Sequence, residues 1–198
     1  MTLSELRTTV RRDLRDEDSG DYRWSDEELD RHIDHAVREF SQAVPREEKA
    51  ALPTAADSLE IDLSPLADLV MVEAVEYPID RVPPCYRRFR VWGSTLAVED
   101  GDTPDGSDCC VYYGGLHTLD EEGSTIPPRF EDLVAAGTEA YALLEWAAYA
   151  LNRTSIGGEE TPARFLAQGQ ERLVRFQNEL RRYSYRNRLR IRRFYPVD

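Results

Sequence analysis

The segment Trp24–Pro45, WSDEELDRHIDHAVREFSQAVP, decides how the N-terminal part of the chain folds. Ser25 and Glu28 have the spacing of a capping box, in which two side chains bond the backbone N–H groups at a helix start. Pro45 cannot continue a helix. Between these signals runs one apolar stripe at helical spacing, formed by Leu29, Ile33, Val37, Phe40 and Val44. We therefore predict an amphipathic helix that begins after Ser25 and ends before Pro45.

The preceding segment has the same design. Thr2 and Glu5 have capping-box spacing. An apolar stripe at helical intervals follows, made of Leu3, Leu6, Val10 and Leu14. The pattern stops at the polar stretch Asp16–Asp21. We predict a first helix that ends there.

The middle of the chain changes from helical to strand-like periodicity between roughly residues 58 and 116. Apolar and polar residues alternate over Leu59–Leu63, and Cys109–Tyr113 is rich in residues that favour strands. Two further apolar runs flank Gly93-Ser94, which predicts a hairpin turn. The pattern indicates a small antiparallel β subdomain.

Helical patterns return after Pro127-Pro128. Phe130–Asn152 is apolar and alanine-rich on more than one face, so we expect it to be the most buried helix. Thr161 followed by Pro162 is a strong helix start. The apolar face of that last helix consists of Phe165, Leu166, Leu173, Phe176 and Leu180.

These patterns predict a mainly α protein, an antiparallel helical bundle with an inserted small antiparallel β subdomain and an extended C-terminal arm. The expected parts are the N-terminal bundle helices in residues 1–50, the β insertion in 51–126, the C-terminal bundle helices in 127–180 and the arm in 181–198.

Charge is distributed unevenly along the chain, which has a net charge of -13. Lys49 is the single lysine among 25 basic residues, and the others are arginine. Residues 164–198 contain ten arginines against three acidic residues, a balance of +7, which leaves -20 for residues 1–163. A basic tail on an acidic body indicates an acidic partner, either nucleic acid or a protein surface.

The arm alternates arginine with aromatic and aliphatic residues beyond Leu180, whereas a solvated helix face would mix both charge signs. Tyrosine and arginine are enriched at interface hot spots, and a highly acidic body would repel a DNA duplex. We therefore favour a protein partner. The predicted partner-binding residues are Arg181, Arg182, Tyr183, Tyr185, Arg186, Arg188, Arg190, Arg192, Arg193, Phe194 and Tyr195.

The sequence contains no recognisable catalytic motif. A nucleophile elbow, a Walker loop, a zinc-type cysteine pair and a dinucleotide glycine fingerprint are all absent. We therefore predict an interaction protein without catalytic residues or cofactors.

Two sets of residues have a spacing similar to that of metal ligands. His32 and His35 lie three residues apart on the predicted helix without an evident third ligand, which favours exposed helix polarity over a metal site. The stretch that contains Asp16, Asp18, Gly20 and Glu27 faintly resembles a calcium loop, but its glycine is one place early. We favour an acidic turn for that stretch, and a bound cation is the open alternative because several carboxylates are close in sequence.

Cysteine content and hydropathy limit where in the cell the protein is expected. The three cysteines, Cys85, Cys109 and Cys110, do not form a disulfide framework. We find no signal peptide and no apolar run long enough to span a bilayer, so we expect assembly in a cytoplasm and no membrane partner.

Three features resemble the head–tail connector (adaptor) proteins of tailed viruses, either bacteriophages or archaeal tailed viruses. The first is Arg23–Phe40, where Trp24 and an acidic cap precede an amphipathic helix. The second runs from Val111–Gly114 through Ile126-Pro127 into Phe130–Asn152. The third is the long last helix that leads into a charged arm.

The resemblance implies a structural protein of the virion neck, assembled in the host cytoplasm. Such proteins form a homo-oligomeric ring, usually twelve-fold, beneath the portal. The ring extends the DNA channel used in ejection and is a platform for the next neck or tail-completion protein. Genomic DNA would pass without specific binding, and the C-terminal arm would contact the portal.

Two alternatives remain open on the sequence. The arm could belong to a nucleic-acid-binding module, which predicts DNA affinity with a steep salt dependence. The chain could also be an enzyme of unrecognised type, which would need a pocket with convergent polar groups.

Overall fold

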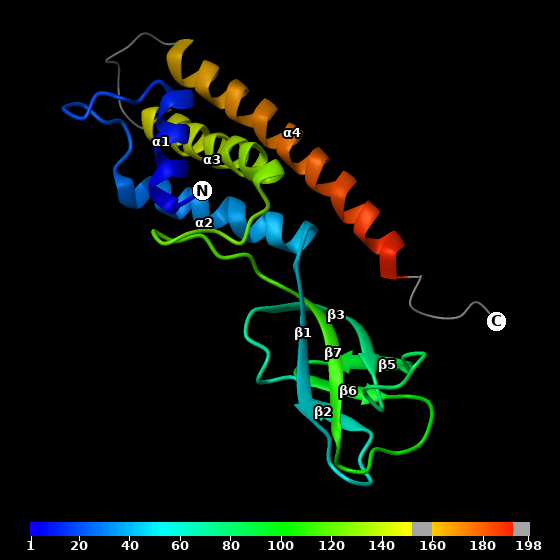
Figure 1. Ribbon diagram of the computed structural model, residues 1–198. Helices are drawn as coiled ribbons and strands as arrows, with labels where there is room; N and C mark the ends of the chain where they lie inside the picture. The colour runs from blue at the N-terminus through cyan, green and yellow to red at the C-terminus, as the bar shows by residue number, and fades with distance from the viewer. Residues whose placement is uncertain (152–159, 192–198) are drawn as a thin grey trace. The chain divides into compact units, whose positions relative to one another are not determined.

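The computed structural model describes residues 1–151 and 160–191, which fall into two compact units (Figure 1). The helical unit comprises residues 1–44 and 117–184. The second unit, called the β unit, contains the strands in residues 45–116 and also includes the end of the last helix from Tyr185 onward. Within the described residues the helices are α1 (Leu3–Leu14), α2 (Asp26–Ala43), α3 (Glu131–Leu151) and α4 (Glu160–Ile191), with a short 3-10 helix at Pro128–Phe130.

Both predicted capping boxes are confirmed in the helical unit. The Thr2 hydroxyl accepts a hydrogen bond from the Glu5 backbone N–H at 3.2 Å, and the Glu5 carboxylate accepts one from the Thr2 N–H at 2.8 Å. The corresponding distances at Ser25 and Glu28 are 3.2 and 2.7 Å. These bonds satisfy backbone donors that have no partner inside the helix, and they fix where α1 and α2 begin.

One hydrophobic core holds the helical unit together. Its buried members include Leu6 and Val10 from α1, Leu29, Ile33 and Phe40 from α2, Val134 and Leu143 from α3, and Phe176 and Leu180 from α4. All four helices therefore contribute the apolar faces that the sequence predicts.

Two glycines bring α3 and α4 close together. A Cβ atom at Gly137 would lie 2.7 Å from the Phe176 ring, and one at Gly169 would lie 2.9 Å from Leu144 Cγ. Both distances are shorter than real Cβ contacts, so any side chain at these positions would force Phe176 or Leu144 to shift.

Replacing Gly137 by valine is expected to lower the free energy of unfolding by about 1–3 kcal/mol, because the new methyl groups would push α4 away from α3. Urea unfolding measures the loss. Ala167→Val on the exposed side of α4 is the matched control, with an expected loss of about 0.5 kcal/mol from helix propensity alone. Equal losses in the two variants would contradict close packing at Gly137.

The β unit contains two antiparallel sheets around its own core. One sheet has the order β1-β7-β3-β4 and the other has the order β2-β6-β5. Leu52, Ile61, Val75, Leu96 and Val111 come from both sheets and are buried in one cluster. The strands are β1 (Arg46–Pro53), β2 (Glu60–Asp62), β3 (Leu69–Glu76), β4 (Tyr86–Arg87), β5 (Phe89–Trp92), β6 (Thr95–Val98) and β7 (Asp108–Gly115).

The prediction of a mainly α bundle is wrong. The structure is 44% helical and 22% strand, with two antiparallel sheets beside the four helices. The strands bury a separate apolar cluster and therefore form a second architectural unit. Strand β1, an edge strand that pairs with β7, was not predicted from the sequence. Its segment REEKAALP contains no β-branched or aromatic residue, and these are the residues that favour strands.

The described part of the predicted arm is helical and not extended. Helix α4 continues without interruption from Glu160 to Ile191. Residues 181–191 contain neither glycine nor proline, so nothing in their sequence ends the helix. None of the described helices combines the length and apolar composition needed to cross a membrane.

Candidate interaction surface

The predicted partner-binding residues fall into three groups. Arg181, Arg182, Tyr183 and Tyr185 lie on α4 with described side chains. Arg186, Arg188 and Arg190 continue the same helix. Arg192, Arg193, Phe194 and Tyr195 lie outside the described residues.

The described members of this set face different surroundings. The Tyr183 ring meets Phe130 edge-on, with centroids 4.9 Å apart, and packs against the core of the helical unit. Tyr185 is 68% exposed, and Arg182 makes a surface ion pair with Glu179 at 3.4 Å. Tyr183 therefore holds α4 on the unit, whereas Arg181, Arg182 and Tyr185 are exposed.

A second stripe runs along the exposed side of α4. Its members recur every three or four residues and are all exposed: Ala163, Ala167, Gln170, Val174, Asn178, Arg181 and Tyr185. Helix packing uses this spacing, so α4 presents a continuous face beside the one it buries in the core.

A polar groove of about 720 Å³ lies between α2 and α3 and is called the α2–α3 groove below. Its lining consists of Arg31, His32, Asp34, His35, Arg38, Glu39, Gln42, Tyr141 and Glu145. The His35 and Tyr141 rings stack at 4.1 Å between centroids with an interplanar angle of 11°. His32 Nε2 lies 2.6 Å from Glu145 Oε2, and Arg31 pairs with the other carboxylate oxygen.

Burial and charge set the titration of this groove. Burial outweighs the neighbouring Glu145 carboxylate and lowers the pKa of His32. Burial acts to raise the pKa of Glu145, but hydrogen bonds from Arg31 and His32 outweigh it and lower that pKa. Burial and the adjacent Glu39 carboxylate raise the pKa of Tyr141.

The two histidines of α2 serve different partners. His32 contacts Glu145, whereas His35 stacks on Tyr141. Among the described side chains no three His, Cys, Asp or Glu residues gather in a metal-binding cluster. The i, i+3 histidine spacing thus reflects two separate contacts.

Acidification is expected to destabilise the helical unit as the pH falls below 6.5, the ordinary pKa of histidine. The folded pKa of His32 is lower than that value, so the unfolded chain takes up the proton first and stability is lost on the way down to the folded pKa. The lowered pKa of Glu145 adds a loss in the same direction at still lower pH.

Thermal unfolding at about pH 7.5 and 5.5 measures this loss. His32→Gln should reduce the difference in melting temperature between the two conditions. His35→Gln, at an exposed position of α2, is the matched control and should keep the full difference. If the His32→Gln variant still shows the full difference in melting temperature between the two pH values, His32 is not the titrating group.

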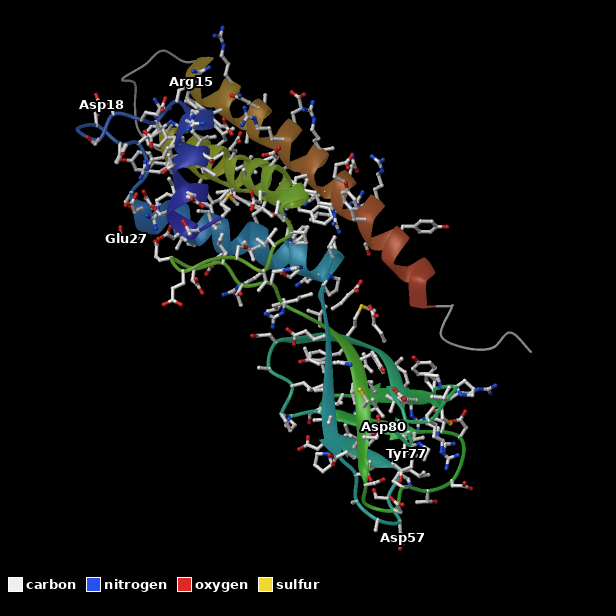
Figure 2. All side chains as sticks on the ribbon, in the orientation of Figure 1. Arg15, Asp18, Glu27, Asp57, Tyr77 and Asp80 are labelled. Carbon is white, nitrogen blue, oxygen red and sulfur yellow. The ribbon has the colours of Figure 1, made fainter. Side chains whose placement is uncertain are left out.

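The acidic turn between α1 and α2 is organised by an arginine. The buried Arg11 guanidinium donates to Asp16 at 2.7 Å, to the Trp24 carbonyl at 3.0 Å and to Asp26 at 2.7 Å. Asp16 also accepts from the Arg23 N–H at 2.7 Å. Asp18 and Glu27 are both exposed, but Asp18 lies in the turn whereas Glu27 lies in the first turn of α2 (Figure 2). Asp16 is the buried carboxylate of the calcium-like stretch, and its cationic partner is Arg11.

Trp24 ties this turn to the core. Its indole N–H donates to the Ala142 carbonyl at 3.2 Å, and its ring contacts that of Trp146. The guanidinium of Arg23 lies over both tryptophan rings and over Phe165 of α4. The tryptophan and acidic cap that carried the sequence resemblance therefore have a structural role in the helical unit.

Comparison with known proteins gives one family. A family model described as SU10 adaptor protein matches residues 1–195 of the chain. No curated protein matches the chain. Because the match spans both units and nearly the whole length, the chain belongs to the SU10 adaptor protein family and is a structural, head–tail adaptor protein of a phage particle.

Proposed function

We propose that this protein forms a homo-oligomeric ring beneath the phage portal. The ring, a dodecamer if it follows the portal, extends the DNA channel in the neck and carries the next neck or tail-completion protein. Membership of the adaptor family supports this function in general terms. In this proposal the protein is assembled in the host cytoplasm before it joins the virion.

One observation carries the proposed portal contact. The last core contact described on α4 is that of Tyr183 with Phe130, yet the helix continues to Ile191. The continuation carries Arg186, Arg188 and Arg190 without an acidic residue. A basic helix segment of this kind suits a charged pocket or groove on another protein.

In this proposal the residues from Arg181 onward contact the portal, with Tyr183 positioning the helix. Arginine charges steer docking, and Tyr185, Phe194 and Tyr195 supply the buried area. The acidic body suits a channel wall, because like charge keeps DNA from adhering as it passes.

Portal binding and DNA binding separate this function from the nucleic-acid alternative. We expect the purified protein to bind purified portal from its own phage, with an association rate that falls as salt rises. We expect no gel shift of a DNA duplex at about 50 mM salt. A strong, steeply salt-dependent shift without portal binding would favour the nucleic-acid module instead.

A further inference from the structure

The four-stranded sheet has a second face, opposite the core of the β unit. Directly opposed residues of neighbouring strands share a face, and successive residues alternate between the two faces. Val75 of β3 pairs with Val111 of β7, and both are buried in the core cluster. The alternate residues of the same strands therefore lie on the other face, called the outer face below, and include Lys49, Ala74, Glu76, Tyr86, Cys110 and Tyr112.

The centre of the outer face is covered. Ala74 has no exposed surface, and Glu76 is 8% exposed. Residues on the solvated face of an antiparallel sheet are normally exposed, as Lys49 is on β1. The burial of Ala74 and Glu76 on the face opposite the core indicates that protein packs over β3 there.

Rings and a carboxylate form the floor of this covered area. The Tyr86 and Tyr112 rings meet edge-on with centroids 6.0 Å apart, and the Tyr112 hydroxyl donates to Glu76 Oε2 at 2.8 Å. The bond to Glu76 and burial raise the pKa of Tyr112, and burial together with the charge of Glu76 raises the pKa of Cys110. A buried carboxylate is stabilised by a cation, and ring edges and faces suit further rings and guanidinium groups. The floor therefore suits a segment that is both basic and aromatic.

The end of α4 brings such a segment to the same unit. The helix is continuous to Ile191, and from Tyr185 onward the chain groups with the strands rather than with the other helices. Residues 192–198, RRFYPVD, follow directly and lie outside the described residues. They offer two arginines followed by Phe194 and Tyr195, which is the chemistry that the floor of the outer face suits.

The length of this segment lets it cross the sheet. An extended chain spans at most about 3.3–3.6 Å per residue, so residues 192–198 can reach roughly 23–25 Å. Neighbouring strands lie about 4.8 Å apart, which makes a four-stranded sheet roughly 14 Å across. A segment that starts beside the strands can therefore lie over β7, β3 and β4.

We propose that residues 192–198 dock on the outer face of their own chain in the free protein, with Phe194 and Tyr195 against Tyr86 and Tyr112 and an arginine beside Glu76. The inference rests on the proposed function, because the same segment is there assigned to the portal. The portal then competes with the outer face for this segment. Docking at home keeps the basic segment off the acidic surfaces of other copies until a portal is present.

Disulfide trapping within one chain tests the docking. Cys110 lies on the outer face, and Tyr195→Cys places a second thiol on the segment that is proposed to cover it. Cys85→Ser removes the other partly exposed thiol, whereas Cys109 is buried and stays. We expect mild oxidation to give an internal disulfide, seen as a faster-migrating monomer and by mass after digestion. The matched control combines Tyr195→Cys with Cys110→Ser and Ser94→Cys, which moves the thiol to the exposed hairpin of the other sheet, and should give no internal disulfide.

Reactivity of the Cys110 thiol gives the second readout. In the Cys85→Ser background, removing residues 192–198 should raise the rate of labelling by N-ethylmaleimide about tenfold, if the segment is docked for about 90% of the time. Replacing Phe194 and Tyr195 together by alanine should have the same effect in the full-length chain. An excess of purified portal should also raise the rate, because it draws the segment off the sheet.

The outcomes separate the docking from the proposed function. Equal labelling rates with and without residues 192–198, and no internal disulfide, would show that the docking is wrong whatever the portal does. A disulfide that joins two chains would place the segment on a neighbouring copy and overturn docking within the chain. If the internal disulfide forms but the reduced protein does not bind portal, the docking stands and the proposed function fails. If the oxidised protein binds portal as tightly as the reduced protein, the segment does not have to leave the sheet and the competition is wrong.

Discussion

Removing residues 185–198 is expected to abolish portal binding while the helical unit stays folded. The truncated chain keeps Phe176, Leu180 and Tyr183, the last described α4 residues that pack on the core. It loses Tyr185 and five arginines. If only two of the lost residues are hot spots worth about 2 kcal/mol each, portal affinity falls about a thousandfold.

Biolayer interferometry with purified portal measures this loss, and thermal unfolding checks that the truncated protein is folded. Tyr183→Ala is the informative comparison, because it should lower the melting temperature through the lost Phe130 contact and leave residues 185–198 in place. Full portal affinity in the truncated protein would show that the C-terminal segment is not the portal contact.

Replacing Arg11 by methionine is expected to lower the free energy of unfolding by about 3–5 kcal/mol, because removal of one partner from a buried ion pair leaves an uncompensated charge. Arg11 and Asp16 are both buried, with 2.7 Å between the bonded atoms. The substitution also removes the donor to the Trp24 carbonyl at 3.0 Å.

Urea unfolding measures this effect. Arg12→Met, at the exposed neighbouring position, is the control and should change stability by less than about 0.5 kcal/mol. The double variant Arg11→Met with Asp16→Asn should recover part of the loss, since it removes the unpaired charge. A loss below about 1 kcal/mol in Arg11→Met would contradict a structural role for the pair.

The helix starts were predictable from the sequence because their signals are local. A capping box at Thr2 and Glu5 or at Ser25 and Glu28 depends on residues three apart, and both boxes form. The hairpin turn at Gly93-Ser94 is equally local, and β5 and β6 flank it as expected. Local backbone chemistry decides these features before any tertiary contact forms.

The features that were missed depend on distant residues. β1 is a strand because it pairs with β7, far along the chain, and its own composition is polar. The helical character of residues 181–191 was missed because the alternation of arginine with rings was interpreted as an extended segment. The separate core of the strands also depends on contacts between distant residues, so a mainly α protein was predicted although the strands form a unit with its own core.

The predicted binding surface was only partly visible in the sequence for the same reason. Composition identifies Tyr183 and Tyr185 equally, yet one packs on Phe130 and the other is exposed. Likewise, nothing local distinguishes the exposed Trp92 from the buried Trp24, because exposure follows from which surfaces each unit leaves uncovered.

Native mass spectrometry of the protein with its portal tests the ring most directly. We predict a complex with one copy of this protein for each portal subunit, and no such complex with the chain that ends at Ser184. A protein that stays monomeric in the presence of portal would contradict the proposed function.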